Sequence, residues 1–249
     1  MKLIIRSIRN FFRYLKRIFS SSKDFWSKNA PEIDSYSKDL IELVSHHTMT
    51  PLLRRWALIK ALHYVNKKNL EGHIVESGIW RGGNLFISKK IQEKYYPQIK
   101  RKFFGYDTFE GMPKPSIYDG KKMNNIYENF IIQNKNWVKA SLEDVINSAS
   151  FFFENIDDFK FIKGKVENTL NDTYNLPDKI CLLRLDTDWY ESTKKELNVL
   201  YPLLVENGIL IIDDYGDMLG CRKALDEFFK NKSVLINSVD KSCRIIIKN

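Results

Sequence analysis

The sequence of 249 residues predicts an α/β fold, a mostly parallel sheet with helices on both faces and an antiparallel hairpin at its C-terminal end. Two observations predict this fold. Short, nearly continuous apolar stretches alternate with helical segments, which is typical of a parallel sheet that is covered on both faces. The last two apolar stretches are joined by a short polar link that leaves no room for a helix, so they are expected to pair antiparallel.

Apolar periodicity places the individual elements. The expected strands are 73–76, 103–106, 159–162, 180–185, 209–212 and the hairpin pair 234–237 and 243–247. The expected helices are 51–65, 85–94, 142–153, 192–204 and 219–229, of which the third begins with a capping pattern at Ser141. The polar stretch 113–139 is long for a connection and is a candidate lid or substrate loop.

The charge of the chain is concentrated at its N-terminus. The net charge is +9, and residues 1–23 hold seven basic residues and no acidic one. Because the remainder is only mildly basic and carries no RNA-binding or zinc-finger pattern, we expect no nucleic-acid partner. Cys181, Cys221 and Cys243 are few and widely spaced, which favours reduced thiols. Without an apolar run of transmembrane length or a signal peptide, the protein is expected in the cytoplasm.

Residues 2–19 show the periodicity of a cationic amphipathic helix. Such a helix can lie on an anionic membrane surface, which would place the protein peripherally at the inner face of the membrane. Its apolar face can equally pack on a partner subunit of a homo-oligomer or on its own domain. The predicted organisation is therefore an N-terminal helix (1–22), a linker and extension (23–50) and a catalytic domain (51–249).

The turn after the first strand is the first candidate binding segment. Glu76 ends the strand, and Gly78, Gly82 and Gly83 let the backbone turn sharply and approach a ligand. The spacing differs from the GxGxxG pattern of dinucleotide-binding proteins. It suits a nucleoside with an amino-acid tail better than a dinucleotide, although such turns also occur for structural reasons.

Asp107 ends the second strand, one βαβ unit after the glycine turn. A carboxylate in this position can accept hydrogen bonds from both ribose hydroxyls of an adenosine, because its two oxygens match two neighbouring donors. An isolated Asp after a strand would be a helix cap or a solvated group. Its place after the glycine turn favours the nucleoside-binding interpretation.

Carboxylates also follow two further strands. Asp186 ends the strand 180–185, with Asp188 two residues on, and Asp213 and Asp214 end the strand 209–212. If those strands are neighbours, the carboxylates converge and repel one another unless a cation joins them. Oxygen ligands favour Mg²⁺ or a similar hard ion. Neutralisation by Arg184 or Arg222 is the structural alternative.

Five segments together resemble the macrocin and mycinamicin O-methyltransferases (TylF/MycF type), which use S-adenosylmethionine (SAM). They are ESGIWRGG (76–83), YDTFEG (106–111), LRLDTDWYEST (183–193), DDYG (213–216) and CRKALD (221–226). The antiparallel ending is also typical of the Rossmann-like sheet of class I methyltransferases. The likeness runs from about Thr48 to the C-terminus and leaves out the first 45 or so residues.

The resemblance implies a SAM-dependent O-methyltransferase that uses Mg²⁺ and methylates a sugar hydroxyl on a glycan or a glycosylated natural product. It implies metal ligation by Asp186, Asp213 and Asp214. The residues that it assigns to SAM, together with the turn and the carboxylate described above, are Thr48, Met49, Glu76, Gly78, Trp80, Arg81, Gly82, Gly83, Asp107, Thr108, Phe109, Glu110 and Glu167.

Methyl transfer from a sulfonium is an in-line displacement, so the acceptor hydroxyl must be aligned and made acidic. We expect Asp186 to serve as ligand and general base, with Asp213 and Asp214 as further ligands. Asp188 could orient the ligands or simply lie as a charge at a helix N-terminus. His46 and His47 could act as a base, but solvated loop histidines are the simpler interpretation.

Two other classes of function remain open at this stage. In a metal-dependent glycosyltransferase, Asp186-Thr187-Asp188 would be a DxD motif that binds a sugar nucleotide through its metal. The glycine turn, Asp107 and the antiparallel ending argue against this class. A catalytically silent scaffold attached to a membrane would use the N-terminal helix but would not need carboxylates at two strand ends.

Overall fold

The computed structural model describes residues 22–133 and 138–249. These residues form two compact units, one that ends at Asp39 and one that runs from Leu40 to Asn249. Helix α2 (Ser22–Asn29) and most of α3 (Ser35–Leu43) belong to the first unit. Asp34 caps α3, because its carboxylate accepts hydrogen bonds from the backbone N–H and the hydroxyl of Ser37. The predicted amphipathic helix over residues 2–19 lies outside the described residues.

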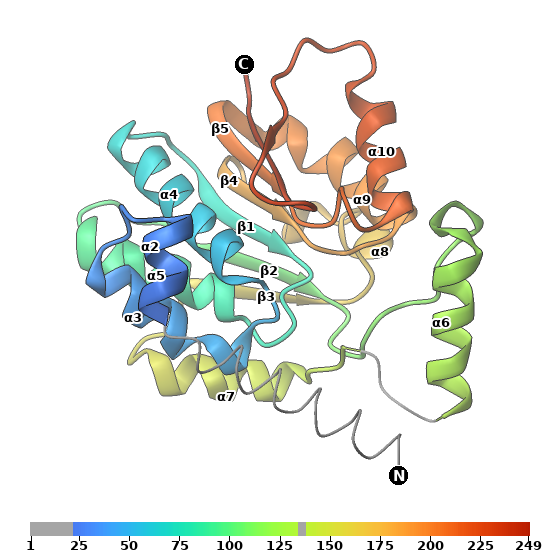
Figure 1. Cartoon of the computed structure of the whole chain (residues 1–249), viewed down its shortest axis with the longest axis horizontal. Coiled ribbons are helices and arrows are strands. Elements are labelled where there is room, and N and C mark those ends of the chain that lie inside the picture. The colour runs from blue at the N-terminus through green and yellow to red at the C-terminus, as the bar shows by residue number, and fades with distance from the viewer. Residues whose placement is uncertain (1–21, 134–137) are drawn as a thin grey trace. The chain divides into compact units, whose positions relative to one another are not determined.

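The second unit is built on a seven-stranded sheet with the order β3-β2-β1-β4-β5-β7-β6 (Figure 1). Strands β1 to β5 are parallel, and β7 pairs antiparallel with β5 and with β6. The strands are β1 (His73–Ser77), β2 (Phe103–Asp107), β3 (Phe159–Lys163), β4 (Ile180–Leu185), β5 (Leu204–Ile212), β6 (Asn237–Ser238) and β7 (Arg244–Ile247). The predicted fold, a mostly parallel sheet that ends in an antiparallel hairpin, is confirmed.

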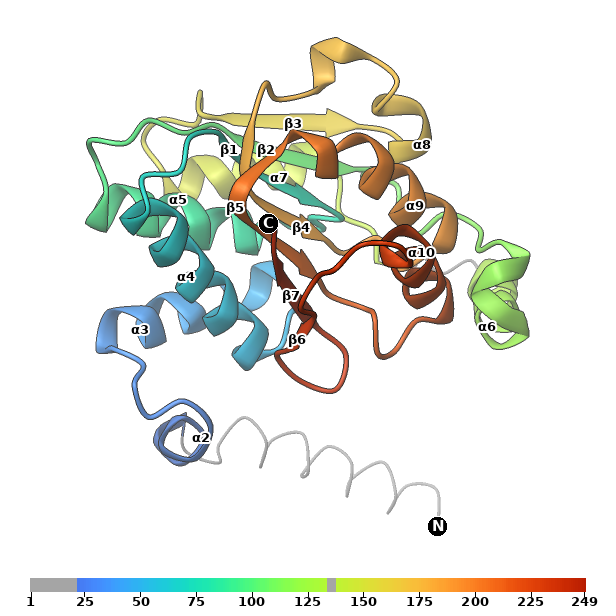
Figure 2. The same ribbon diagram turned by 90° about the horizontal axis from the view of Figure 1, so that it is seen from above.

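Helices cover both faces of this sheet (Figure 2). One face carries α4 (Leu52–Lys67), α5 (Gly83–Tyr95) and α7 (Leu142–Phe152), and the other carries α8 (Val166–Thr169), α9 (Tyr190–Val199) and α10 (Leu219–Phe229). Ser141 and Asp144 form the predicted capping box of α7. The short 3-10 helices are η1 (Ser45–His47), η2 (Ile117–Asp119), η3 (Thr173–Asn175) and η4 (Tyr201–Leu203).

The core lies against the buried strands. Every residue of β4 is buried, as expected for a central strand covered on both faces. Alternate residues of the strands, among them Val75, Leu183, Leu185, Leu210 and Ile212, pack in one cluster with Leu197 of α9 and Leu225 of α10. Each such side chain contributes about 1.5–3 kcal/mol by leaving water, so this core fixes the strands from which the polar loops extend.

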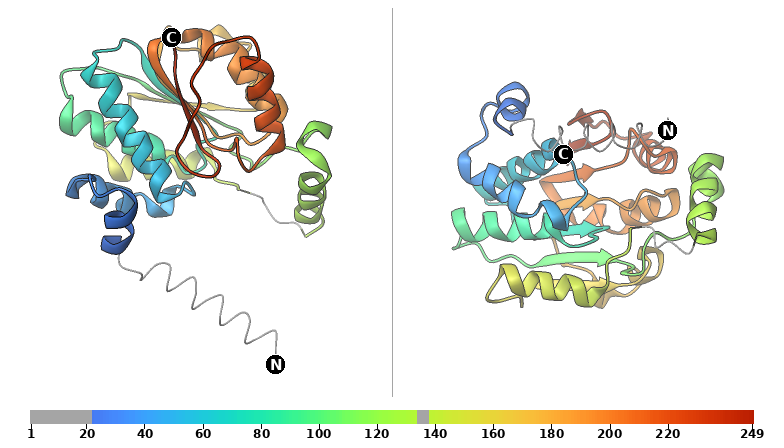
Figure 3. Two further views of the ribbon diagram at one scale, coloured as in Figure 1. Left: turned by 45° about the horizontal axis from the view of Figure 1, so that its top comes forward. Right: turned by 60° about the horizontal axis from the view of Figure 1, so that its bottom comes forward.

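Three elements differ from the sequence-based expectations. The polar stretch 113–139 contains a helix, α6 (Gly120–Ile132), which has no buried residue and lies apart from the sheet (Figure 3). Strand β5 begins at Leu204, where the apolar pattern had predicted the end of a helix. The apolar residues 234–236 precede β6 and do not belong to it, because only Asn237 and Ser238 pair with β7.

The strand register decides where a ligand can bind. The last residues of four adjacent strands lie side by side, since Ser77 aligns with Tyr106 on one side and with Leu185 on the other, and Leu185 aligns with Ile212. The chain reverses its winding direction between β1 and β4, which is the point where doubly wound sheets bind ligands. Over residues 22–133 and 138–249, no helix has the length and apolar character needed to cross a membrane.

Candidate active site

A cavity of about 470 Å³ opens at this edge of the sheet. Its walls come from the segment before α4, from the segments that follow β1, β2, β3, β4 and β5, and from the loop between β6 and β7. The predicted functional residues that line it are Thr48, Met49, Gly78, Trp80, Asp107, Thr108, Glu167, Asp186, Asp213 and Asp214. Residues from segments far apart in the sequence thus meet in one place.

The turn after β1 is pressed against the end of β4. Gly78 has a φ of 80°, and a Cβ at this position would lie 2.0 Å from the backbone oxygen of Asp186. The backbone N–H of Asp186 in turn donates to the carbonyl of Ser77 at 2.9 Å. Only glycine fits this turn, and its close approach brings the glycine turn and the carboxylates after β4 into the same cavity.

Asp107 is held by backbone N–H groups on both of its oxygens. One oxygen accepts from Trp80 at 2.9 Å and the other from Phe109 at 2.8 Å. Burial raises the pKa of Asp107, and these hydrogen bonds oppose the shift. Trp80 and Phe109 have φ values of 48° and 54°, a strained backbone that is typical of functional sites. Oδ1 also has a contact of 3.5 Å from the hydroxyl of Thr108, and the carboxylate, with about four lone-pair sites, keeps capacity to accept from a ligand hydroxyl.

The remaining residues that were assigned to the cofactor lie behind or beside the cavity wall. Glu76 is buried beneath the turn, where it accepts hydrogen bonds from Asn84 and Arg184. A Cβ at Gly83 would lie 2.6 Å from the carbonyl oxygen of His47, so Gly83 allows α5 to pack on that segment. These two residues shape the site from behind. Gly82 and Phe109 are likewise part of the turns and do not line the cavity.

Arg81 and Glu110 lie at the surface side of the same turns. The guanidinium of Arg81 stacks on the ring of Trp80, 5.2 Å from its centre. The carboxylate of Glu110 forms an exposed ion pair with Lys163 at 3.0 Å. Neither residue lines the cavity. His47 packs its ring against Phe152, and burial lowers its pKa, so the structure does not present it as a solvated loop residue.

Asp186, Asp188 and Asp214 form an acidic cluster, in which one oxygen of each carboxylate lies within 4.8 Å of the others. Burial raises the pKa of all three groups, in the case of Asp188 to about 7, and repulsion among the carboxylates adds to the effect. The Oδ2 atom of Asp214 is buried and has no hydrogen-bond partner among the described residues. Three converging carboxylates, one of which has a buried oxygen without a partner among the described residues, fit a hard divalent cation.

Asp213 lies outside this acidic cluster. Its carboxylate accepts from Arg184 at 2.5 Å on one oxygen and from Arg54 on the other. The sequence groups Asp213 with Asp186 and Asp214 as metal ligands, and it leaves Asp188 either as a residue that orients the ligands or as a charge at a helix N-terminus. In the structure Asp188 belongs to the cluster, because its left-handed backbone (φ 66°) turns the chain back towards the carboxylates. An Asp that adopts such a φ readily was the only sequence signal.

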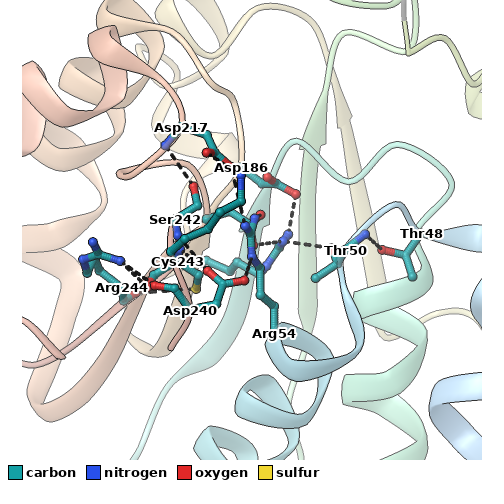
Figure 4. A network of polar contacts seen from close by, with 12 residues as sticks. Thr48, Thr50, Arg54, Asp186, Asp217, Asp240, Ser242, Cys243 and Arg244 are labelled. Carbon is teal, nitrogen blue, oxygen red and sulfur yellow. Dashed lines mark hydrogen bonds and ion pairs between the residues drawn. The ribbon is translucent and has the colours of Figure 1, made fainter. Parts of the chain in front are cut away.

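Asp213 belongs instead to a buried ion network made of Glu76, Arg184, Asp213, Arg54 and Asp240, of which Figure 4 labels Arg54 and Asp240. Arg54 at the start of α4 donates to Asp240 at 2.7 Å. Asp240 also accepts from the backbone N–H groups of Ser242 and Cys243, and this fixes the loop between β6 and β7. The network thus pairs three carboxylates with two guanidinium groups and joins five segments of the chain.

The structural comparison gives the same fold in known enzymes. The O-methyltransferase NovP superposes with a TM-score of 0.73 over 82% of this chain and 82% of that chain, with 24% sequence identity. This similarity concerns the fold alone. A TDP-rhamnose 3'-O-methyltransferase of calicheamicin biosynthesis, in its apo structure, has a TM-score of 0.54 with 19% identity and covers 97% of this chain and 94% of that one.

Sequence comparison matches the family described as macrocin-O-methyltransferase (TylF) over residues 20–246. The match therefore begins well before Thr48 and includes the helices α2 and α3. Demethyldecarbamoylnovobiocin O-methyltransferase of Streptomyces niveus is 30% identical over 186 residues, which are 73% of this chain and 67% of that protein. Mycinamicin III 3''-O-methyltransferase of Micromonospora griseorubida is 29% identical over 73% of this chain and 70% of its own length.

A third relative carries a sugar in its name. The 8-demethyl-8-(2,3-dimethoxy-alpha-L-rhamnosyl)-tetracenomycin-C 4'-O-methyltransferase of Streptomyces olivaceus is 30% identical over 183 residues. The match covers 73% of this chain and 67% of that enzyme.

Proposed function

The chain belongs to the macrocin O-methyltransferase family and is an O-methyltransferase, and from this premise we propose that it methylates a sugar hydroxyl with the help of a divalent cation. The family relationship supports SAM as the methyl donor. It does not support the glycosyltransferase alternative, so Asp186-Thr187-Asp188 is not a DxD motif for a sugar nucleotide. The observation that carries the proposal is that the glycine turn, Asp107 and the acidic cluster line one cavity.

We assign the donor to the part of the cavity between Gly78 and Asp107. The free lone pairs of Asp107 can accept from the two ribose hydroxyls, while Gly78 leaves the backbone open to close approach. Met49 and Thr48 close the cavity on the side of η1, and Glu167 lies in its wall at the start of α8. This arrangement directs the methyl group towards the loops after β4 and β5.

The cation would be held by Asp186 and Asp214, because Asp214 offers an unsatisfied buried oxygen and Asp186 lies beside it. Oxygen donors of this kind prefer Mg²⁺ or a similar hard ion. When bound, the ion would lower the pKa of an acceptor hydroxyl and hold it in place. Asp213 does not take part as a ligand in this proposal, since two guanidinium groups already satisfy its carboxylate.

The proton of the acceptor is assigned to Asp188. The sequence pointed to Asp186 as the base, but Oδ2 of Asp186 accepts from Arg184 at 2.7 Å, so one of its two oxygens is already engaged by a guanidinium. Asp188 has no ion pair within the described residues, and its pKa is raised to about 7. In the transfer the acceptor oxygen forms a bond to the methyl carbon, the carbon–sulfur bond breaks, and Asp188 receives the hydroxyl proton.

The acceptor class rests on the relatives, one of which is named for a rhamnosyl-bearing substrate. A sugar presents neighbouring hydroxyls, and two such groups can approach a cation together, which selects the reacting oxygen by geometry. Met112, Pro113 and Met218 line the cavity and offer apolar surface to the rest of the acceptor. The proposed acceptor is therefore a sugar on a larger molecule.

Methyl transfer from radiolabelled SAM tests this function. A panel should contain rhamnosylated natural products, free deoxysugars and a catechol, each assayed with Mg²⁺, with EDTA, and with EDTA followed by excess Mg²⁺. We expect transfer to glycosylated acceptors, loss of transfer in EDTA and recovery on adding Mg²⁺. Transfer to the catechol without transfer to any sugar would refute the acceptor class, and full activity in EDTA would refute the role of the cation.

A further inference from the structure

The guanidinium of Arg184 contacts residues from both sides of the cavity. It is 2% exposed and lies on β4 beneath the cavity floor. One terminal nitrogen donates to Glu76 at 2.5 Å and to Asp186 at 2.7 Å. The other donates to Asp213 at 2.5 Å and to the hydroxyl of Thr50 at 3.0 Å. Asp186 of the acidic cluster and Thr50 of the segment before α4 therefore share one guanidinium group.

All N–H groups on the two terminal nitrogens of Arg184 are in use. Each of these nitrogens carries two N–H groups, and each makes two contacts. The group cannot move towards one partner without lengthening its bond to another. A change in the charge or position of the Asp186 carboxylate is therefore felt at Thr50, and the reverse holds as well.

Thr50 is the anchor of the segment Thr48–Thr50, which lines the donor side of the cavity. Its hydroxyl accepts from Arg184 and from Asn84 at 3.0 Å, and its backbone N–H donates to the hydroxyl of Thr48 at 3.1 Å. Met49 is 59% exposed, so burial of its side chain does not hold the segment in place. Polar contacts through Thr50 do.

We propose that Thr50 is a positioning residue that couples donor binding to cation binding through Arg184. The inference rests on the proposed function, because it requires a SAM-type ligand and a divalent cation in the same cavity. A ligand packed on Met49 and Thr48 orders the segment, and the segment holds the Arg184 guanidinium and, with it, Asp186. The first ligand to bind restricts the conformational freedom of these groups, so the second ligand loses less conformational entropy and binds more tightly.

The test measures Mn²⁺ affinity with and without S-adenosylhomocysteine (SAH). SAH is the demethylated product of SAM and has a neutral sulfur, so direct repulsion between two cations does not mask the coupling. The free Mn²⁺ signal in electron paramagnetic resonance gives the affinity. For the natural protein we expect SAH to tighten Mn²⁺ binding about fivefold or more, within the usual range of coupling between sites.

Variants at Thr50 decide whether the hydroxyl carries this coupling. Thr50→Val and Thr50→Ala remove the hydroxyl and should bring the ratio of the Mn²⁺ affinities with and without SAH to about one. Thr50→Ser keeps the hydroxyl and should show the natural ratio. Thr50→Ala leaves room for a water on Arg184 and serves if the valine variant does not fold. Thr193→Val is the matched control, because Thr193 is 1% exposed on α9 and does not line the cavity.

The outcomes separate the inference from the proposed function. If the natural protein binds neither SAH nor Mn²⁺, the proposed function fails. If it binds both without coupling, or if folded Thr50→Val or Thr50→Ala keeps the natural ratio, the role of Thr50 is refuted while the proposed function stands. A loss of coupling in Thr193→Val equal to that in Thr50→Val would also refute it, since any buried hydroxyl would then suffice.

Discussion

The buried ion network and the acidic cluster lie next to each other, but they differ in how their negative charges are balanced. Asp213 and Asp214 are consecutive residues after β5, and each is less than a tenth exposed. Asp213 accepts from two guanidinium groups, while Asp214 keeps an oxygen with no partner among the described residues. Every carboxylate of the network has a guanidinium partner, whereas in the acidic cluster only Asp186 has one, and Asp188 and Asp214 have no ion pair within the described residues.

Under the proposed function, this difference separates carboxylates with a structural role from those that would bind the cation or take the proton. Removing one partner of a buried ion pair leaves an uncompensated charge and costs several kcal/mol. Removing a carboxylate from a group that repels itself costs little stability and can even add some. Stability and function should therefore respond in opposite ways to changes in the two regions.

The largest expected effect comes from breaking the centre of the network. Arg184→Met would leave Glu76 and Asp213 buried with reduced compensation, and we expect the free energy of unfolding to fall by about 3–5 kcal/mol. Urea denaturation followed by circular dichroism measures this change. Lys223→Met, which removes an exposed ion pair with Glu227, is the control and should leave the transition in place. An unchanged transition in Arg184→Met would remove the structural role of the network.

The adjacent residues Asp213 and Asp214 give the sharpest paired comparison. In EDTA, Asp213→Asn should lose about 2–4 kcal/mol of stability, because Arg54 and Arg184 lose a charged partner. Asp214→Asn should be as stable as the natural protein or more stable, since it relieves repulsion in the cluster, yet it should lose Mg²⁺-dependent transfer. Thermal melts and the methyl-transfer assay check both variants. Equal stability losses in the two would contradict the distinction between the regions.

The cluster also predicts how stability depends on pH when no cation is present. An unfolded Asp has a pKa of about 3.9, and burial raises the pKa of Asp188 to about 7 in the folded protein. The folded state then favours the protonated form, so this contribution is fully present at low pH and is lost as the pH rises through about 7. We expect the melting temperature in EDTA to fall by about 5 °C between pH 5 and pH 8.

Saturating Mg²⁺ should remove most of that fall, because the ion stabilises the charged carboxylates. The matched measurement is Asp188→Asn in EDTA, which should flatten the curve over the same range. A melting temperature that rises with pH in this interval would contradict this prediction, because it would mean that the folded protein stabilises the charged form of these carboxylates.

Asp107 tests the donor half of the cavity. Asp107→Ala removes the acceptor for two ribose hydroxyls and also releases the N–H groups of Trp80 and Phe109. We expect SAH to bind roughly 10–100-fold more weakly, which corresponds to about 1.4–2.8 kcal/mol. Isothermal titration calorimetry gives this affinity. If SAH affinity is unchanged, the nucleoside does not lie between Gly78 and Asp107.

The smallest effect is expected at Glu110, three residues after Asp107. Its carboxylate forms an exposed ion pair with Lys163 and does not line the cavity. Glu110→Ala should therefore change SAH affinity by less than about twofold, in line with the small energies of surface ion pairs. Calorimetry under the same conditions as for Asp107→Ala makes the comparison direct. A loss as large as that of Asp107→Ala would show that the loop closes over the ligand.

The positions of the candidate residues could be predicted from the sequence, and Arg184 was named as a neutralising alternative, but the carboxylates that it contacts could not be predicted. The carboxylates after β4 and β5 were expected to converge if those two strands were neighbours, and the structure makes them neighbours that end at the same edge. Which of them would face an arginine depends on side-chain direction within the loops. Asp213 and Asp214 are equivalent in sequence, and only the register of β4 and β5 places Arg184 beside one of them.

The stretch that contains α6 was predicted to be a loop, although apolar residues recur in it at helical spacing. α6 begins at Gly120 and contains three asparagines, which are weak helix formers, and it buries none of its residues. Residues 234–236, which were predicted as part of a strand, are apolar but do not pair in the sheet. For these residues strand pairing, and not local composition, decides the outcome.

The most direct test of the account is a crystal structure with SAH and Mn²⁺, in which anomalous scattering locates the ion. The account predicts one ion about 2.2 Å from oxygens of Asp186 and Asp214. Asp188 should lie beside that ion, Asp213 should remain on Arg54 and Arg184, and the ribose should lie on Asp107. An ion coordinated by Asp213, or crystals with SAH in place and no ion at the acidic cluster, would contradict it.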